Sequence, residues 1–259
     1  MCLSLKIFLG HIAYLKDKCD YILIPRVSNY GKNEKVCVKF NATYDLVKNL
    51  FPNTKILDYN IEKNKNRFTI LSFLKIGLKI NKNPLKVLFS YFIAKRNYKK
   101  ENQKKYNEQI KKISNQKKLK ILIVSHPYNI YDNYIGTPII KKLASMNIEI
   151  IYADKLNPKI SRKYAKVLSP TLYWTYSKEL IGSVAYYKES IDGIIFLTAF
   201  PCGPDSLVNE LLLRKIDDIP MTNILIDELT ASAGLETRLE SFVDIIEERR
   251  KKYGTNLPK

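Results

Sequence analysis

The sequence contains no run of about 18 uncharged apolar residues, the length that a membrane-spanning helix requires. The longest candidate, Val87 to Ala94, is far too short. The first residues, from Met1 to Lys6, also lack the apolar stretch and the small-residue cleavage site of a secretory signal peptide. We therefore expect a cytoplasmic protein with no membrane span.

Several nucleotide-binding and catalytic motifs are missing as well. No Walker A sequence and no GxGxxG follows any strand that the pattern predicts, and the nucleophile elbow GxSxG is not found at the predicted turns. These absences argue against ATP binding through a P-loop, against dinucleotide binding through the Rossmann fingerprint, and against hydrolase chemistry of the elbow type.

Cysteine is scarce, and none of the four cysteines forms a CxxC pair, so zinc-ribbon spacing is absent. In a reducing compartment, free thiols serve metal ligation or reactivity more often than disulfides. Cys19 ends a predicted helix and is interpreted as structural. Spacing alone assigns no metal to the other three, but if they meet in space they suit a [4Fe–4S] cluster or a zinc ion, each with one open site. These three are Cys2, Cys37 and Cys202.

Positive charge is abundant but concentrated in one segment. The formal net charge is +19, and residues 61–120 hold 18 Lys or Arg against 3 Asp or Glu, a net of +15. We interpret this segment as a solvated linker helix, with a basic surface that meets lipid or a partner as the alternative. Because the rest of the chain is nearly balanced, we do not expect nucleic-acid binding, although salt-dependent binding through residues 61–120 stays a competing hypothesis.

Apolar strands alternate with helices in the second half of the chain. This order predicts an α/β fold, with Rossmann-like parallel sheet domains covered by helices on both faces and joined by a helical linker. The expected strands are 120–125, 148–152, 193–197 and 221–226, and the expected helices are 136–146, 171–188, 204–215 and 235–252.

The first half is less regular. We expect helices at 3–16, 42–51, 67–80 and 84–116, strands at 21–25 and 55–57, and a polar loop at 26–40. The resulting domains are a partial N-terminal α/β domain with two candidate ligand cysteines, a basic helical linker or insertion, and a C-terminal Rossmann-like α/β domain. Their ranges are 1–60, 61–118 and 119–259.

Polar or reactive side chains follow three of the predicted strands, at the sheet edge where parallel α/β proteins gather functional groups. His126 follows the first strand and is a candidate general acid or hydrogen-bond donor to substrate. Asp227 and Glu228 follow the fourth and would serve as a base or as a cap for the last helix. His11, on a short helix, is interpreted as a packed histidine.

Cys202 lies between the third strand and a helix, in the turn Pro201-Cys202-Gly203-Pro204. The helix N-terminus is expected to lower the pKa of this thiol and to suit a thiolate ligand. Gly203 would let the backbone approach a ligand closely. The alternative is a small buried cysteine in a tight turn.

Several segments of the chain together resemble one known family. Phe200 to Val208 resembles the FxCGPDS signature of 2-hydroxyacyl-CoA dehydratase-like, activase-related proteins, of which the 2-hydroxyglutaryl-CoA dehydratase component D-like proteins are an example. Further similarities cover most of the chain apart from about 60–118. They are Cys2 to His11, Tyr21 to Arg26, Cys37 to Lys39, Ser125 to Asp132, Leu172 to Thr175, and Leu225 to Phe242.

The resemblance implies a function. Relatives hold a [4Fe–4S] cluster through three cysteines, and Cys2, Cys37 and Cys202 occupy the matching positions. An ATP-dependent activase is the implied partner, because in relatives it couples ATP hydrolysis to one-electron transfer into the cluster. A CoA thioester is the implied substrate, and the activity would be that of a lyase or a low-potential reductase component, in a homo- or hetero-oligomer.

The chain also departs from the family pattern. Relatives usually carry a strand and a helix before the first cysteine, so a truncated or alternatively started version is expected here. Ser4 and Val38 replace prolines, and Asn41 stands where some relatives have another cysteine. A non-catalytic cluster-binding or activase-interacting module is therefore the alternative function.

Overall fold

The computed structural model describes residues 1–31, 33–62, 69–228 and 232–253, and the chain divides into two compact units. The N-terminal unit comprises Met1, residues 3–103 and residues 173–175. The C-terminal unit comprises Cys2, residues 104–172 and residues 176–259. The domain boundaries expected from the sequence stay a prediction.

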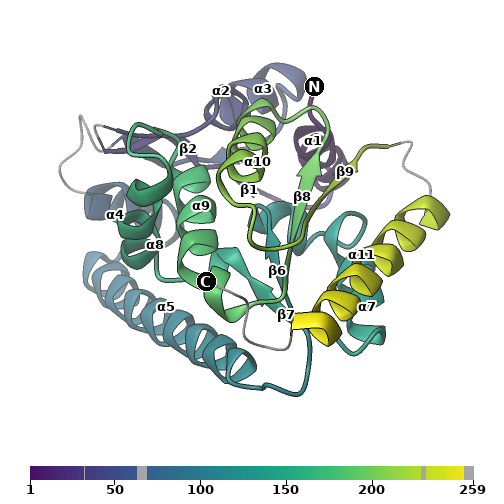
Figure 1. Ribbon diagram of the computed structural model, residues 1–259. Coiled ribbons are helices and arrows are strands. Elements are labelled where there is room, and N and C mark those ends of the chain that lie inside the picture. The colour runs from purple at the N-terminus through teal and green to yellow at the C-terminus, as the bar shows by residue number, and fades with distance from the viewer. Residues whose placement is uncertain (32, 63–68, 229–231, 254–259) are drawn as a thin grey trace. The chain divides into compact units, whose positions relative to one another are not determined.

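A parallel sheet of four strands forms the centre of the C-terminal unit, in the order β7-β6-β8-β9 (Figure 1). All seven residues of β8 are buried, which explains why its sequence is apolar from Gly193 to Leu197 rather than alternating. The strands are β6 (Lys120–Val124), β7 (Glu149–Tyr152), β8 (Gly193–Ala199) and β9 (Met221–Ile226).

Helices cover both faces of this sheet. On one face, Leu122 and Phe196 belong to a buried core with residues of α8, α9 and α10. On the other face α11 packs against β8, since a Cβ built at Gly193 would lie 2.4 Å from the Cδ1 atom of Ile246. The predicted α/β fold class is therefore confirmed. The helices of this unit are α6 (Pro127–Ile130), α7 (Gly136–Ser145), α8 (Pro158–Leu168), α9 (Thr175–Tyr187), α10 (Gly203–Lys215) and α11 (Ser232–Tyr253), with short 3-10 turns η1 (Ala153–Lys155) and η2 (Lys188–Ser190).

The charged end of α5 (Pro84–Ile113) contributes to the same core, although the sequence suggested a solvated helix. Gln109 is 2% exposed, and its amide nitrogen donates to the Tyr152 carbonyl and to the Tyr187 hydroxyl, both at 2.9 Å. Its amide oxygen accepts from the Tyr152 backbone N–H at 2.9 Å. The buried Gln109 amide thus provides hydrogen-bond partners for the backbone of Tyr152 in β7 and for the hydroxyl group of Tyr187 in the core.

The N-terminal unit has shorter strands in two small sheets. The first pairs β1 with β4 in parallel, and in the second β2 pairs antiparallel with β3 and parallel with β5. Its strands are β1 (Ile22–Leu23), β2 (Arg26–Gly31), β3 (Glu34–Lys35), β4 (Ile56–Leu57) and β5 (Asn60–Glu62), and its helices are α1 (Leu3–Leu15), α2 (Val38–Asn41), α3 (Thr43–Leu50), α4 (Thr69–Ile80) and the start of α5.

Three sequence-based expectations need correction. The loop expected at 26–40 contains strands β2 and β3, because Val27 and Asn29 are the inward residues of β2 and the polar Asn29 hides the alternation. Helix α8 was not expected, and α9 begins at Thr175 rather than at residue 171. His11 is exposed rather than packed. Residues 67–68 of the expected helix 67–80 lie outside the described residues.

Within the described parts of the chain, no helix combines the length and the apolar character needed to cross a lipid bilayer.

Candidate functional site

The candidate site lies at the carboxyl ends of β6 and β8. After β6 the chain adds β7 on one side, and it then returns to add β8 and β9 on the other side. The reversal of strand order makes the gap between β6 and β8 the topological switch point, where parallel α/β proteins bind ligands. The loop with His126 follows β6, and the loop with Cys202 follows β8.

A buried hydrogen-bonded pair of side chains joins these two loops. The Nε2 atom of His126 lies 2.8 Å from the Oδ1 atom of Asp205, and both side chains are 7% exposed. Asp205 lies in the first turn of α10, three residues after Cys202. Its role was missed from the sequence, where it appears only as one letter of the turn. The sequence contains only a partial signal, because both residues follow predicted strands, but it does not contain the strand order that makes these two strands neighbours.

Aromatic rings surround the His126 side chain. Tyr128 stacks on the imidazole with ring centroids 4.9 Å apart, and Tyr176 meets it edge to face at 5.9 Å. The Nδ1 atom of His126 is buried and has no hydrogen-bond partner among the described residues. Because an ionised carboxylate only accepts hydrogen bonds, Asp205 places a proton on Nε2 and leaves Nδ1 as the atom able to serve a bound group.

The Asp205 carboxyl is held ionised. Burial raises its pKa, but the charge of His126 and the hydrogen bonds from His126 and Cys202 outweigh burial and lower the pKa below its usual value. Asp205 therefore contacts both the candidate acid–base residue and the candidate thiolate ligand.

The thiol of Cys202 departs from expectation. Its pKa is raised above the usual value, first by burial and then by the negative charge of Asp205, with a smaller contribution from Cys2. The helix N-terminus was expected to lower this pKa, and that expectation was wrong because burial and Asp205 have the larger effect. A bound metal ion would supply the positive charge that the thiolate lacks, so this environment suits a metal-bound sulfur better than a free nucleophile.

The other two candidate ligands are thiols outside any disulfide bond, and both are partly buried. Cys2 precedes α1 and is grouped with the C-terminal unit. Cys37 belongs to the N-terminal unit and caps α2, where the Phe40 backbone N–H donates to its Sγ atom at 3.3 Å. Cys19, by contrast, is exposed. The residues fit a thiolate-bound group in their chemistry, although no set of three or more His, Cys, Asp or Glu side chains in the described part of the chain is arranged to hold a metal ion.

Space is available beside Cys202. A Cβ atom built at Gly203 would meet no heavy atom within 4 Å, so the start of α10 is open at that point. Gly136 behaves in the opposite way, since its Cβ would lie 2.1 Å from the Ile130 carbonyl oxygen. The glycine at the start of α7 thus lets the loop that carries His126 lie directly on that helix.

Glu228 lies exposed in the turn after β9. His126 follows β6, and β8 lies between these two strands in the sheet. The structure therefore gives His126 a close carboxylate partner in Asp205 rather than in Glu228. Asp227 is half-buried, and residues 229–230 of the same expected loop lie outside the described residues.

A second polar cluster fixes the far end of the His126 loop. The Tyr131 hydroxyl donates to the two carboxylate oxygens of Asp154 at 3.0 and 3.3 Å, and the Lys155 ammonium lies 4.0 Å from the Tyr152 ring centroid. Burial raises the pKa of Asp154 and of Tyr131. This cluster was not foreseen, and it anchors the loop to the end of β7.

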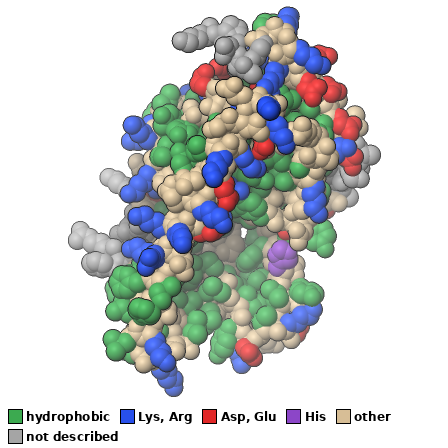
Figure 2. Space-filling model, turned by 90° about the horizontal axis from the view of Figure 1, so that it is seen from below, with side chains coloured by type: hydrophobic (Ala, Val, Ile, Leu, Met, Phe, Trp, Pro, Cys, Tyr) green, Lys and Arg blue, Asp and Glu red, His purple; other side chains and the backbone are tan. Residues whose placement is uncertain are grey.

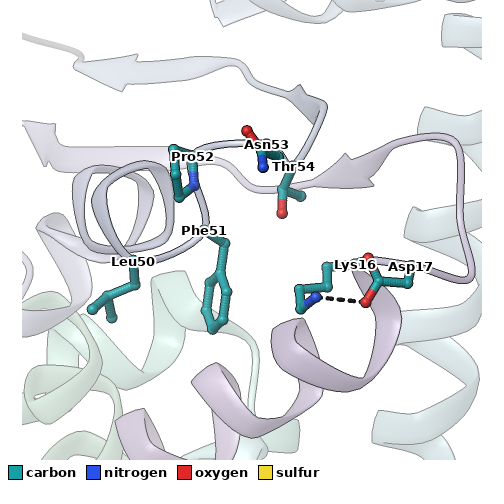
Figure 3. A pocket seen from close by; sticks show the side chains of 7 residues that line it. All are labelled: Lys16, Asp17, Leu50, Phe51, Pro52, Asn53 and Thr54. Atoms are coloured by element: carbon teal, nitrogen blue, oxygen red, sulfur yellow. Dashed lines mark hydrogen bonds and ion pairs between the residues drawn. The ribbon is translucent and has the colours of Figure 1, made fainter.

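The N-terminal unit has a pocket of its own, formed by the end of α1 and the segment after α3 (Figure 3). The Phe51 ring points into it, and Lys16 forms an ion pair with Asp17 at its rim. None of the candidate site residues lines this pocket, so we assign it no chemistry. Its lining residues are Lys16, Asp17, Leu50, Phe51, Pro52, Asn53 and Thr54.

Comparison with known proteins gives one match. A family model described as CoA enzyme activase uncharacterised domain (DUF2229) matches residues 1–156. No curated protein and no solved structure matches the chain. The matched range includes Cys2, Cys37 and His126, and it ends before Cys202.

Proposed function

Because the chain belongs to the family of CoA enzyme activase uncharacterised domains, we propose that it is the iron–sulfur component of a 2-hydroxyacyl-CoA dehydratase-like redox system. The observation that carries the proposal is the position of Cys202. It is a half-buried free thiol beside open space, at the switch point of a parallel sheet and next to a buried His–Asp pair.

Cys2, Cys37 and Cys202 would hold a [4Fe–4S] cluster. When bound through three thiolates, such a cluster supplies one-electron redox chemistry and one iron with an open position. The burial of Cys202 and the negative charge of Asp205 disfavour a bare thiolate and favour a sulfur bound to a cation. The amide of Phe40 that donates to Cys37 would stabilise a thiolate there.

His126 would exchange a proton with the substrate at its Nδ1 atom. Asp205 would act as a positioning residue, since its carboxylate accepts a hydrogen bond from the Nε2–H group and fixes the ring. A 2-hydroxyacyl-CoA thioester whose hydroxyl group leaves as water needs such a proton donor. Glu228 would be a second, more exposed candidate for proton transfer.

An ATP-dependent activase would be the electron-donating partner, as the membership of the chain in an activase-related family suggests. A partner subunit in a homo- or hetero-oligomer would complete the dehydratase.

Iron and acid-labile sulfide analysis after anaerobic purification tests the cluster. We expect a brown protein with about four irons per chain. Serine at position 2, 37 or 202 should each lower the iron content severely, whereas Cys19→Ser should leave it unchanged because Cys19 is exposed. A colourless, iron-free preparation made without oxygen would refute the proposal.

Turnover separates the dehydratase from a non-catalytic module. With an activase, ATP and a 2-hydroxyacyl-CoA, His126→Ala should lower the dehydration rate by about a hundredfold, the usual size of a general acid–base contribution, while the iron content stays the same. A full cluster with no turnover on any CoA thioester would leave the cluster-binding module as the function.

A further inference from the structure

Helices α4 and α5 form a hairpin that the proposed function does not use. Residues 81–83 join the two helices, and the Asn83 side chain caps α5 by accepting from the backbone N–H groups of Leu85 and Lys86 at 3.0 and 3.1 Å. A Cβ atom at Gly77 would lie 2.4 Å from the Cγ1 atom of Val87, so the glycine allows the helices to pack closely.

The start of α5 carries an apolar stripe that is exposed. Its five members follow the spacing i, i+3, i+4, i+7 and i+8, which is the pattern of an amphipathic helix whose apolar side packs on a core. Here each of them is between 38% and 76% exposed. The stripe consists of Leu85, Leu88, Phe89, Phe92 and Ile93, and Leu78 and Ile80 at the end of α4 are 43% and 72% exposed.

The charged side chains that the hairpin itself contributes around this stripe are all basic, and one of them, Lys79, pairs with Asp58 of the same unit at 3.1 Å. Residues 69–100 contain eight Lys or Arg and no Asp or Glu. Lys82 and Lys86 lie exposed at the turn of the hairpin, beside Leu85. Lysine side chains of this kind lie along apolar surface and extend their ammonium groups into a polar layer. Figure 2 shows one face of the molecule, on which hydrophobic, basic and acidic side chains are interspersed.

We propose that the α4–α5 hairpin binds the surface of an anionic lipid bilayer. The apolar stripe would enter the boundary between headgroups and acyl chains, and the lysines would contact the anionic headgroups. Charge complementarity favours this occupant over a second copy of the chain, because two hairpins without acidic residues would repel each other. The hairpin would lie on the membrane and not cross it.

Sedimentation of the full chain with phosphatidylcholine vesicles that contain phosphatidylglycerol tests the proposal, with pure phosphatidylcholine vesicles as the reference. We expect binding to the anionic vesicles only. The pair Lys82→Glu and Lys86→Glu should weaken this binding about thirtyfold or more, as expected for two basic residues near a charged surface. The pair Leu85→Ser and Phe89→Ser should weaken it about tenfold or more, since two apolar side chains lose their burial.

A matched control separates this site from general adsorption of a basic protein. Lys163 and Lys166 are exposed residues of α8, and reversing both changes the net charge by the same amount. This control pair should weaken vesicle binding by no more than about threefold, because charges beyond the Debye length are screened. Since all four altered hairpin side chains are exposed, their variants should keep the wild-type circular dichroism spectrum.

Three results would overturn the proposal. The first is equal weakening by the hairpin and the control pairs. The second is a concentration-dependent dimer in sedimentation velocity that the Leu85→Ser and Phe89→Ser pair abolishes, since the stripe would then be a self-association surface. The third is binding to DNA without binding to vesicles.

Discussion

The sheets of the two units differ in the length of their strands and in how deeply these strands are buried. In the C-terminal unit, β6 and β8 are continuous apolar strands whose central residues are fully buried. In the N-terminal unit, β1 and β4 are two residues long, and Leu23 in β1 is 56% exposed. The long, covered strands of the C-terminal unit hold the loops of His126 and Cys202 in fixed positions, whereas the short strands of the N-terminal unit are partly exposed.

The first prediction concerns core burial in the two units. Ile194 in β8 is 0% exposed, so Ile194→Ala should lower the free energy of unfolding by about 4 kcal/mol. Leu23→Ala in β1 should cost less than about 1 kcal/mol, because the side chain is already half in solvent. Urea unfolding measures both values. Equal losses would show that the two sheets contribute alike.

The second prediction uses two glycines. A Cβ at Gly182 in α9 would lie 1.8 Å from the Ser161 carbonyl oxygen, so Gly182→Ala should destabilise the protein by about 3 kcal/mol through overpacking. At Gly10 in α1 no heavy atom lies within 4 Å, and alanine there should stabilise the helix by about 0.5–1 kcal/mol. Thermal unfolding of the two variants should therefore shift in opposite directions.

The third prediction concerns the end of α5. Gln109→Ala removes three hydrogen bonds and leaves the N–H and carbonyl groups of Tyr152 without these partners, so it should cost about 2 kcal/mol. Asn102→Ala is the control, at an exposed position of the same helix in the N-terminal unit, and it should change the stability by less than about 0.5 kcal/mol. Similar values for the two variants in urea unfolding would contradict a core role for Gln109.

The smallest effect is expected for Tyr187. Burial, the largest effect, raises the pKa of Tyr187 to about 12. The hydrogen bond from Gln109 lowers this pKa but does not outweigh burial. The folded state prefers the neutral phenol, so this stabilisation is complete below the unfolded value of about 10 and is lost as the pH rises toward 12. Tyr187→Phe should cost about 1 kcal/mol at pH 8, through the lost hydrogen bond, and less at pH 11.

The exposed Tyr21 in the N-terminal unit provides a control for removing a tyrosine hydroxyl. Tyr21→Phe should change the free energy of unfolding at pH 8 by less than about 0.5 kcal/mol, because the side chain is exposed. If the stability difference between Tyr187→Phe and the wild type does not change with pH, the phenol of Tyr187 does not contribute to alkaline unfolding.

The sequence predicted the C-terminal sheet well because its central strands β6 and β8 are buried on both faces, which leaves long apolar runs. For the same reason the sequence predicted that His126 and Cys202 lie at the same edge of the sheet, since each residue follows the end of an apolar run. It did not predict β2, where Asn29 is a buried polar residue, nor the burial of Gln109, whose partners lie more than forty positions away along the chain. The pairing of His126 with Asp205 depends on strand order, which local patterns do not contain.

The exposure of Cys19 has a practical consequence for handling the protein. A thiol in solvent is the first to react with an alkylating reagent or to form a disulfide between two molecules in air. The rate at which Cys19 is modified therefore serves as an internal reference. The slower modification rates of the three half-buried thiols can be compared with it in one mass-spectrometric experiment. Replacing this single residue should remove most of the oxidative cross-linking that would otherwise accumulate during storage.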